Sequence, residues 1–160
     1  MVLPISIEEI EDSAFENCSS LKSISLPMAL KTIGDGALKG TGLRTIEIPK
    51  SVFWLGDGLL ADCQSMERVT IPENIGRIPD RMFEGCTNLK KVELHEKLGA
   101  IGERAFFGCS SLDFIVIPDS VKQIGQDAFT NTDKQFIIQC SFGSYAEEYA
   151  RKNKFKYQLV

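Results

Sequence analysis

The chain has 160 residues, 43% of them apolar and 25% charged, with a net charge of −4 and an isoelectric point near 5.1. These values are ordinary for a globular protein, and the acidic balance disfavours binding to nucleic acid, which normally requires a basic surface. No apolar run approaches the ~20 residues that span a bilayer, so insertion into a membrane is not expected.

The first residues, Met1–Pro4, contain neither a basic segment nor an apolar one, so they do not form a signal peptide. Two locations are therefore open: the cell surface or extracellular space, as part of a longer precursor, or the cytoplasm. Met1–Pro4 also enters the first repeat in its middle, already at the positions of a strand. We expect that an N-terminal cap is absent, and that upstream sequence or a partner covers the first repeat.

A pattern of 22–23 residues occurs six times along residues 1–140. One apolar position shows it most clearly, with successive spacings of 23, 22, 23, 23 and 23 residues: Phe15, Leu38, Leu60, Phe83, Phe106 and Phe129. A fixed period of this length predicts a solenoid, in which each repeat buries its apolar side only against its neighbours.

Each repeat contains a predicted strand with one buried face, because two apolar positions recur two residues apart, as at Ile115 and Ile117. Proline follows this strand in five copies and His95 replaces it in the sixth. A glycine position later in the repeat is filled by Pro79 in one copy. Because the proline ring fixes φ near −65°, this position indicates a close approach of backbone rather than a left-handed turn.

The chain has five cysteines, an odd number. Four of them occupy one position of the repeat: Cys18, Cys63, Cys86 and Cys109. Stacked at the ~4.8 Å spacing of parallel strands, their Cβ atoms would be too far apart for a disulfide, which needs about 3.8 Å. We therefore predict buried free thiols that pack as small apolar groups. No two cysteines lie within four residues of each other and there is a single histidine, so no zinc site or other cofactor is expected.

The last copy loses the repeat pattern, and residues 141–160 are predicted to form a C-terminal cap. Ser144 and Glu147 have the spacing of a capping box, which indicates a helix at about 144–153. Basic residues gather at its expected end, where they suit the helix dipole: Arg151, Lys152 and Lys154. An extended tail follows to Val160. Solenoids need such a cap to cover their last repeat.

The whole pattern resembles the BspA-like (Treponema pallidum type) leucine-rich-repeat family of bacterial surface proteins. The residues that carry the likeness are 112–129, the preceding Gly108-Cys109-Ser110-Ser111, and the closing segment Gly143–Asn153. His95 and Pro79 depart from the family pattern. The resemblance implies a leucine-rich-repeat solenoid, a mostly β, right-handed coil of about six repeats with a parallel sheet on its concave face. It also implies non-catalytic proteins at the cell surface or secreted, which bind host or bacterial proteins, often in adhesion.

In such a coil, strand residues between the buried ones face the concave surface. Those positions change along the chain from polar to apolar, and the predicted protein-binding residues are Arg68, Lys91, Glu93, Phe114, Val116 and Ile137. Phe114 and Val116 are the strongest candidates, because contiguous exposed apolar residues usually mark a binding surface. For Ile137 the alternative is packing under the C-terminal cap.

Two further positions carry aromatic residues where the other copies have small or polar ones. Phe53 and Trp54, the only tryptophan, occupy a predicted surface position, and Phe107 occupies another. Tryptophan is enriched where binding energy concentrates at interfaces, so we predict an interface here. The alternative is an isolated aromatic side chain lying on the surface, which is common.

His95 lies near Glu93 and Glu96 and could be taken for a general base. It occupies a structural proline position, however, and the sequence has no nucleophile motif, phosphate loop or metal spacing beside it. An enzyme is therefore not expected. The predicted function is a protein-binding module of a bacterial cell-surface or secreted protein. The alternatives are a structural spacer within a longer protein, and an intracellular protein that associates weakly with itself through its open first repeat.

Overall fold

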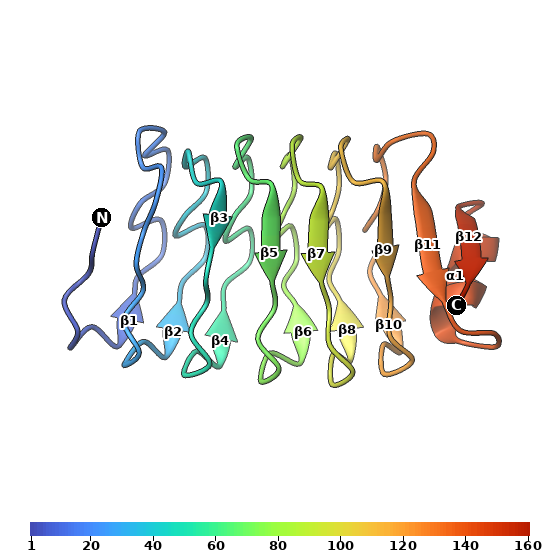
Figure 1. Cartoon of the computed structure of the whole chain (residues 1–160), viewed down its shortest axis with the longest axis horizontal. Coiled ribbons are helices and arrows are strands. Elements are labelled where there is room, and N and C mark those ends of the chain that lie inside the picture. Colours follow the sequence, from blue (N-terminus) through green and yellow to red (C-terminus); the bar gives the residue numbers. More distant parts are fainter.

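The computed structural model describes all 160 residues as an elongated solenoid in which each repeat forms one turn. Figure 1 shows the turns stacked side by side from the N-terminus to a helix at the C-terminal end. Strands run along two faces of the stack, and every strand pair is parallel. The mostly β solenoid with a short C-terminal helix, predicted from the repeat, is confirmed.

One face carries the predicted strands, and we call it the long-strand face. Its strands are β3 (Thr45–Ile46), β5 (Arg68–Thr70), β7 (Lys91–Glu93), β9 (Phe114–Val116) and β11 (Ile137–Cys140). The register follows the repeat, so that Arg68 pairs with Lys91 and Phe114 pairs with Ile137. The ladder is interrupted once: β3, β5 and β7 form one sheet, and β9, β11 and β12 (Lys156–Leu159) form another.

The other face carries strands that the sequence did not predict, and we call it the short-strand face. Its members are two residues long: β1 (Glu9–Ile10), β2 (Thr32–Ile33), β4 (Trp54–Leu55), β6 (Arg77–Ile78), β8 (Ala100–Ile101) and β10 (Gln123–Ile124). They form two separate sheets, β1-β2-β4 and β6-β8-β10. Two residues are too few for the alternation of a strand to be recognised in a sequence.

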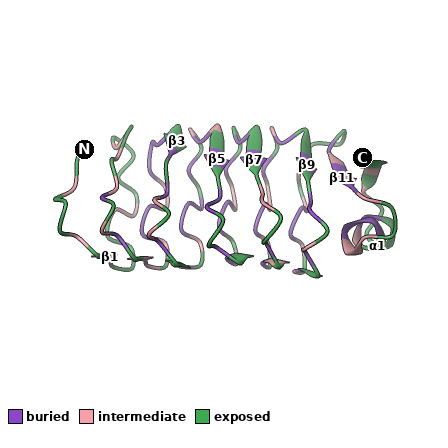
Figure 2. Cartoon of the chain, turned by 60° about the horizontal axis from the view of Figure 1, so that its bottom comes forward, coloured by how far each residue is buried: buried purple, intermediate pink, exposed green.

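The core runs through the middle of the stack as one cluster of 40 buried residues. Figure 2 shows buried residues alternating with exposed ones around each turn. Four phenylalanines, one above the other, form a continuous aromatic stack with ring centroids 5.2, 5.2 and 5.3 Å apart: Phe83, Phe106, Phe129 and Phe136. Each ring therefore fills the space between its neighbours, so the turns depend on one another for their packing.

The glycine position marks a close approach of two backbones, as predicted. Gly102 does not have a positive φ, and a Cβ atom built on it would lie 2.6 Å from the Asp80 nitrogen. Beside this contact, an aspartate ladder links successive turns. Asp35 donates its N–H to Asp12 Oδ1, Asp57 to Asp35 Oδ1, and Asp80 to Asp57 Oδ1, at 2.8, 2.8 and 3.0 Å.

Three of the four aligned cysteines are buried free thiols; Cys18 is also free, but its predicted burial is wrong. Cys86 Sγ donates to Leu60 O at 3.0 Å, and Cys109 Sγ donates to Phe83 O at 3.2 Å. Burial raises the pKa of Cys109 to about 12. Cys18 is exposed because the first turn has a neighbouring turn on only one side.

This difference predicts the reactivity of the thiols. In the native protein, Ellman's reagent at mildly alkaline pH should label Cys18 rapidly and leave the buried thiols unreacted, because only the thiolate is nucleophilic. All five cysteines should react after unfolding in guanidinium. A C18S variant should show almost no native reaction, and rapid labelling of that variant would contradict the buried arrangement.

The C-terminal segment covers the last turn with a helix and a strand. Helix α1 (Tyr145–Lys152) begins after Ser144, whose side chain accepts the N–H of Glu147 at 3.2 Å. The Glu147 carboxylate accepts the N–H of Gly143 rather than that of Ser144, so the reciprocal bond of a capping box is shifted by one residue. Strand β12 then pairs with β11.

The first turn is packed less completely than the turns that follow it. Its core residues Phe15, Leu21, Ile24 and Leu26 are half-buried, whereas the corresponding residues of later turns are almost entirely buried, except for Leu94. The apolar end of the stack is thus partly open to solvent at the turn that contains β1.

Candidate binding surfaces

The long-strand face carries an exposed apolar patch near its C-terminal end, formed by Phe114, Val116 and Ile137. Phe114 is 44% exposed and Val116 is 48% exposed, while the intervening Ile115 points into the core. Phe114 lies beside Ile137, and Val116 lies beside Gln139. Ile137 is half-buried, and its neighbour on the other side is Lys156 of the terminal strand. The two strongest sequence candidates are therefore outward and adjacent.

The polar candidates lie on the same face, in the neighbouring sheet. Arg68 and Lys91 are exposed and paired in register, and Lys91 forms a salt bridge of 2.7 Å with Glu93. Hydrogen bonds from Lys91 and from the Thr70 hydroxyl lower the pKa of Glu93. Strands β7 and β9 are near each other but are not joined by a ladder. The face thus consists of a charged half and an apolar half.

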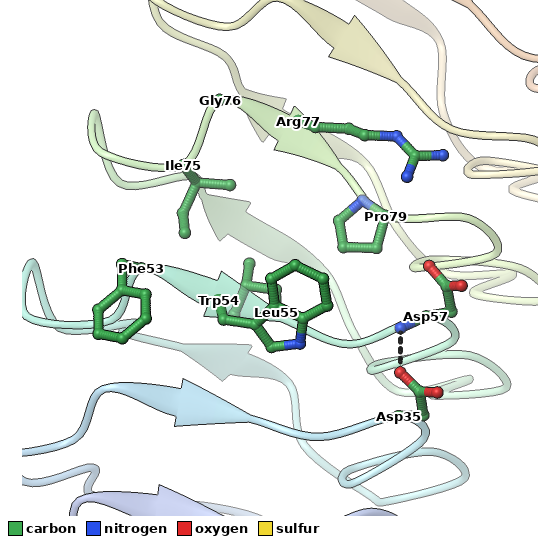
Figure 3. A pocket seen from close by; sticks show the side chains of 9 residues that line it. All are labelled: Asp35, Phe53, Trp54, Leu55, Asp57, Ile75, Gly76, Arg77 and Pro79. Carbon is green, nitrogen blue, oxygen red and sulfur yellow. Dashed lines mark hydrogen bonds between the residues drawn. The ribbon is translucent and has the colours of Figure 1, made fainter.

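On the short-strand face, Phe53 and Trp54 line a groove of about 410 Å³. Each is 61% exposed, which agrees with their predicted surface position. Figure 3 shows both rings beside β4, with Gly76 and Pro79 on the next turn and the Arg77 side chain extending away from the rings. Asp35 and Asp57 complete one end of this groove.

The groove lies where the ladder of the short-strand face is broken, between β4 and β6. In the neighbouring turns, a glycine N–H bonds to the carbonyl of the turn before it: Gly56 to Ile33, Gly102 to Ile78 and Gly125 to Ile101. Pro79 occupies this position opposite Leu55 and has no N–H to donate. Figure 1 shows β4 and β6 further apart than the strands on either side of them. We call this break the β4–β6 seam.

Phe107 is less available than Phe53 and Trp54. It is half-buried, and the guanidinium carbon of Arg104 lies 3.8 Å from its ring centroid. Arg104 also bonds to both carboxylate oxygens of Glu84, at 3.2 and 2.6 Å. This cation–π contact joins two side chains of the same chain at its surface. The structure therefore places Phe107 apart from the other aromatic candidates and partly covered.

His95 makes two hydrogen bonds to the backbone. Its Nε2 lies 3.1 Å from Ile75 O, and its Nδ1 accepts the N–H of Lys97 at 3.2 Å, so the ring proton is on Nε2. The Nε2 bond joins two turns, and the Nδ1 bond holds the loop that contains His95 itself. No group of three or more His, Cys, Asp or Glu side chains is arranged to hold a metal ion.

Two features of these surfaces were not found from the sequence. The β4–β6 seam has a signal, Pro79 in a glycine position, but the backbone break that follows from it was not inferred. Phe142 is 82% exposed in the loop between β11 and α1. It lies outside the repeat, so no aligned residue of another copy could show that it is unusual.

The structure is that of a leucine-rich-repeat protein: its turns are regular and parallel, Leu, Ile and Phe form a buried column, and the outward strand positions vary. Proteins of this class typically serve as non-catalytic protein-interaction modules. The BspA type leucine-rich-repeat family matches residues 8–137 in six copies. The chain belongs to this family, as its resemblance implied.

Solved structures of bacterial leucine-rich-repeat proteins share the fold. A leucine rich cell surface protein from Faecalibacterium prausnitzii is 34% identical, with a TM-score of 0.79 over 87% of this chain and 38% of its own. The Treponema pallidum leucine-rich-repeat protein is 25% identical, with a TM-score of 0.58 over 87% of this chain and 57% of its own. A protein from Bacteroides ovatus is 24% identical, with a TM-score of 0.68 over 99% of this chain and 53% of its own.

The chain thus spans about half the length, or less, of these relatives. Among curated proteins, no significant match is found. None of the helices in the structure has the length and apolar character needed to cross a membrane.

Proposed function

We propose that this chain is the protein-binding part of a bacterial cell-surface or secreted protein and that it acts in adhesion. The observation that carries the proposal is the apolar patch of Phe114, Val116 and Ile137 on the long-strand face. The cell-surface location is supported by the F. prausnitzii protein, which is described as a cell surface protein and is 34% identical.

The patch is suited to binding because its residues cost little to order and gain much on burial. Phe114 and Val116 are held on a strand and paired on one side with β11, so their positions are fixed before a partner arrives. Burying a Phe or Val side chain completely contributes roughly 1.5–3 kcal/mol. The charged half of the face, with Arg68, Lys91 and Glu93, would form the polar rim of the same interface.

A double variant, F114S/V116S, tests the proposal. Both side chains point outward, so the fold should persist, while capture of partner proteins from host extracellular matrix or bacterial lysate should fall at least about tenfold, equivalent to about 1.4 kcal/mol. The partner is identified from the wild-type capture and its affinity is then measured with purified protein. T45S is the matched control, since Thr45 occupies the same outward position as Phe114 three turns away. Unchanged affinity of F114S/V116S would refute binding through the patch.

Self-association is a second candidate function, because the core residues of the first turn are half-buried at the open end of the stack. Covering Phe15, Leu21, Ile24 and Leu26 with a second copy would bury apolar surface as stacking does elsewhere in the solenoid. Light scattering over a range of concentrations measures this directly. A monomer at every concentration would contradict the second candidate and leave the first unaffected.

A further inference from the structure

The β4–β6 seam leaves backbone hydrogen-bonding groups without partners at the surface. At one position of the short-strand face, a backbone N–H bonds to a backbone carbonyl of the turn before it. Examples are the Phe53 N–H to Lys31 O at 3.0 Å and the Gly99 N–H to Gly76 O at 2.8 Å. The Gly76 N–H makes no such bond to Phe53 O. Both residues are exposed, so an unpaired backbone donor and an unpaired backbone acceptor lie at the surface of the seam, where a ligand can satisfy them.

The groove over the seam also has an aromatic side that no other turn has. Phe53 and Trp54 project from the turn that contains β4. At the position of Phe53, the next two turns have glycine, Gly76 and Gly99. Phe53 therefore stands beside a residue without a side chain, while Trp54 lies between Thr32 and Arg77 of the adjacent turns. A flat group entering the groove could stack on the Trp54 indole.

The charge of the groove is negative. Asp35 and Asp57 each use Oδ1 to accept a backbone N–H of the next turn, and neither Oδ2 atom accepts a hydrogen bond from the protein. Arg77, the only cation among the lining residues, is already paired with Asp80. Two exposed carboxylates therefore remain available at the end of the groove next to the Trp54 ring.

From these three observations we propose that the β4–β6 groove binds an extended peptide segment of a partner protein through an arginine side chain. The peptide lies across the groove, and its backbone bonds to the unpaired Gly76 N–H or to the Phe53 carbonyl. The guanidinium stacks on Trp54 and pairs with Asp57 or Asp35. Arginine fits better than lysine, because a planar guanidinium can both stack on an indole and pair with a carboxylate.

The single tryptophan makes the proposal directly measurable, since Trp54 is the only source of tryptophan fluorescence in the chain. The probe is a seven-residue peptide without aromatic residues, built from alternating Thr and Val with a central Arg. It should change the emission of Trp54 saturably, and raising the salt concentration should weaken binding. The same peptide with Glu in place of Arg should leave the emission unchanged.

A D35N/D57N variant tests the role of the carboxylates. Asparagine keeps the Oδ1 acceptor that holds the next turn but removes the charge, so the fold should persist while the affinity for the arginine peptide falls about three- to tenfold. D113N is the control, because it removes an exposed carboxylate at the long-strand face. F114S/V116S should bind the arginine peptide normally, which separates this site from the apolar patch.

Three outcomes would overturn the proposal: no fluorescence change at millimolar arginine peptide, an equal response to the glutamate peptide, or an equal affinity of D35N/D57N and D113N. A saturable response to a neutral oligosaccharide, with none to the arginine peptide, would likewise overturn it and assign the Trp54 ring to sugar stacking.

Discussion

Phe106→Ala is expected to destabilise the protein by about 3–5 kcal/mol, the range for removal of a buried phenylalanine. Phe106 is fully buried and lies between Phe83 and Phe129, with centroid distances of 5.2 Å to both. Alanine would leave a cavity between two rings whose positions are fixed by their own neighbours. Since domains have a total stability of roughly 5–15 kcal/mol, this single change could remove most of it.

Urea unfolding followed by circular dichroism measures this effect, with Phe53→Ala as the matched control. Phe53 is 61% exposed and lies outside the core, so its replacement should change the free energy of unfolding by about 0.5 kcal/mol or less. If both variants lost similar stability, the aromatic stack would not be the centre of the core.

Gly102→Ala is expected to cost about 1–3 kcal/mol, although it adds one methyl group and the backbone φ is permitted for alanine. The added Cβ would lie 2.4 Å from Asp80 Oδ1, 2.6 Å from the Asp80 nitrogen and 2.7 Å from the Pro79 carbonyl carbon. Two of these atoms are backbone, so the turns themselves would have to move apart. That movement would also strain the bond from the Glu103 N–H to Asp80 Oδ1.

Gly99→Ala, three residues earlier in the same turn, is the control. Its Cβ would meet only Gly76 O, at an ordinary 3.5 Å. Replacing a glycine where alanine fits is neutral or stabilises by about 0.4–1 kcal/mol, because it restricts the unfolded chain. Thermal unfolding of the two variants should therefore move in opposite directions or differ by several degrees. Equal melting temperatures would contradict the close approach at Gly102.

Much of the fold could be predicted from the sequence because the repeat states each structural requirement several times. The core column of Phe83, Phe106 and Phe129, the strand residues Ile115 and Ile117, and the close approach at Gly102 all follow from aligned copies. The exposure of Trp54 and Phe114 followed from the same alignment, since Trp54 stands where the other copies are small or polar and Phe114 lies between buried strand residues.

Features that depend on how two particular turns meet could not be predicted in this way. Cys18 belongs to the same column as Cys86. That position is buried only when a turn packs on each side of it, and the first turn has a neighbouring turn on one side only. The break between β4 and β6 arises from one missing N–H at Pro79. The column showed that Pro79 was unusual, but not that the space beside Gly76 would remain open.

The aspartate ladder limits how far the two turns can separate at the β4–β6 seam. Asp57 Oδ1 holds the N–H of Asp80 at 3.0 Å, and the Asn74 side chain bonds to Val52 O, so the two turns are tied at both ends of the unpaired strands. Backbone bonds join the same two turns as well, from the Gly58 N–H to Asp80 O at 2.8 Å and from the Leu60 N–H to Met82 O at 3.0 Å. The seam is thus a local gap in the backbone ladder, enclosed by bonds that keep the two turns at the spacing of the stack.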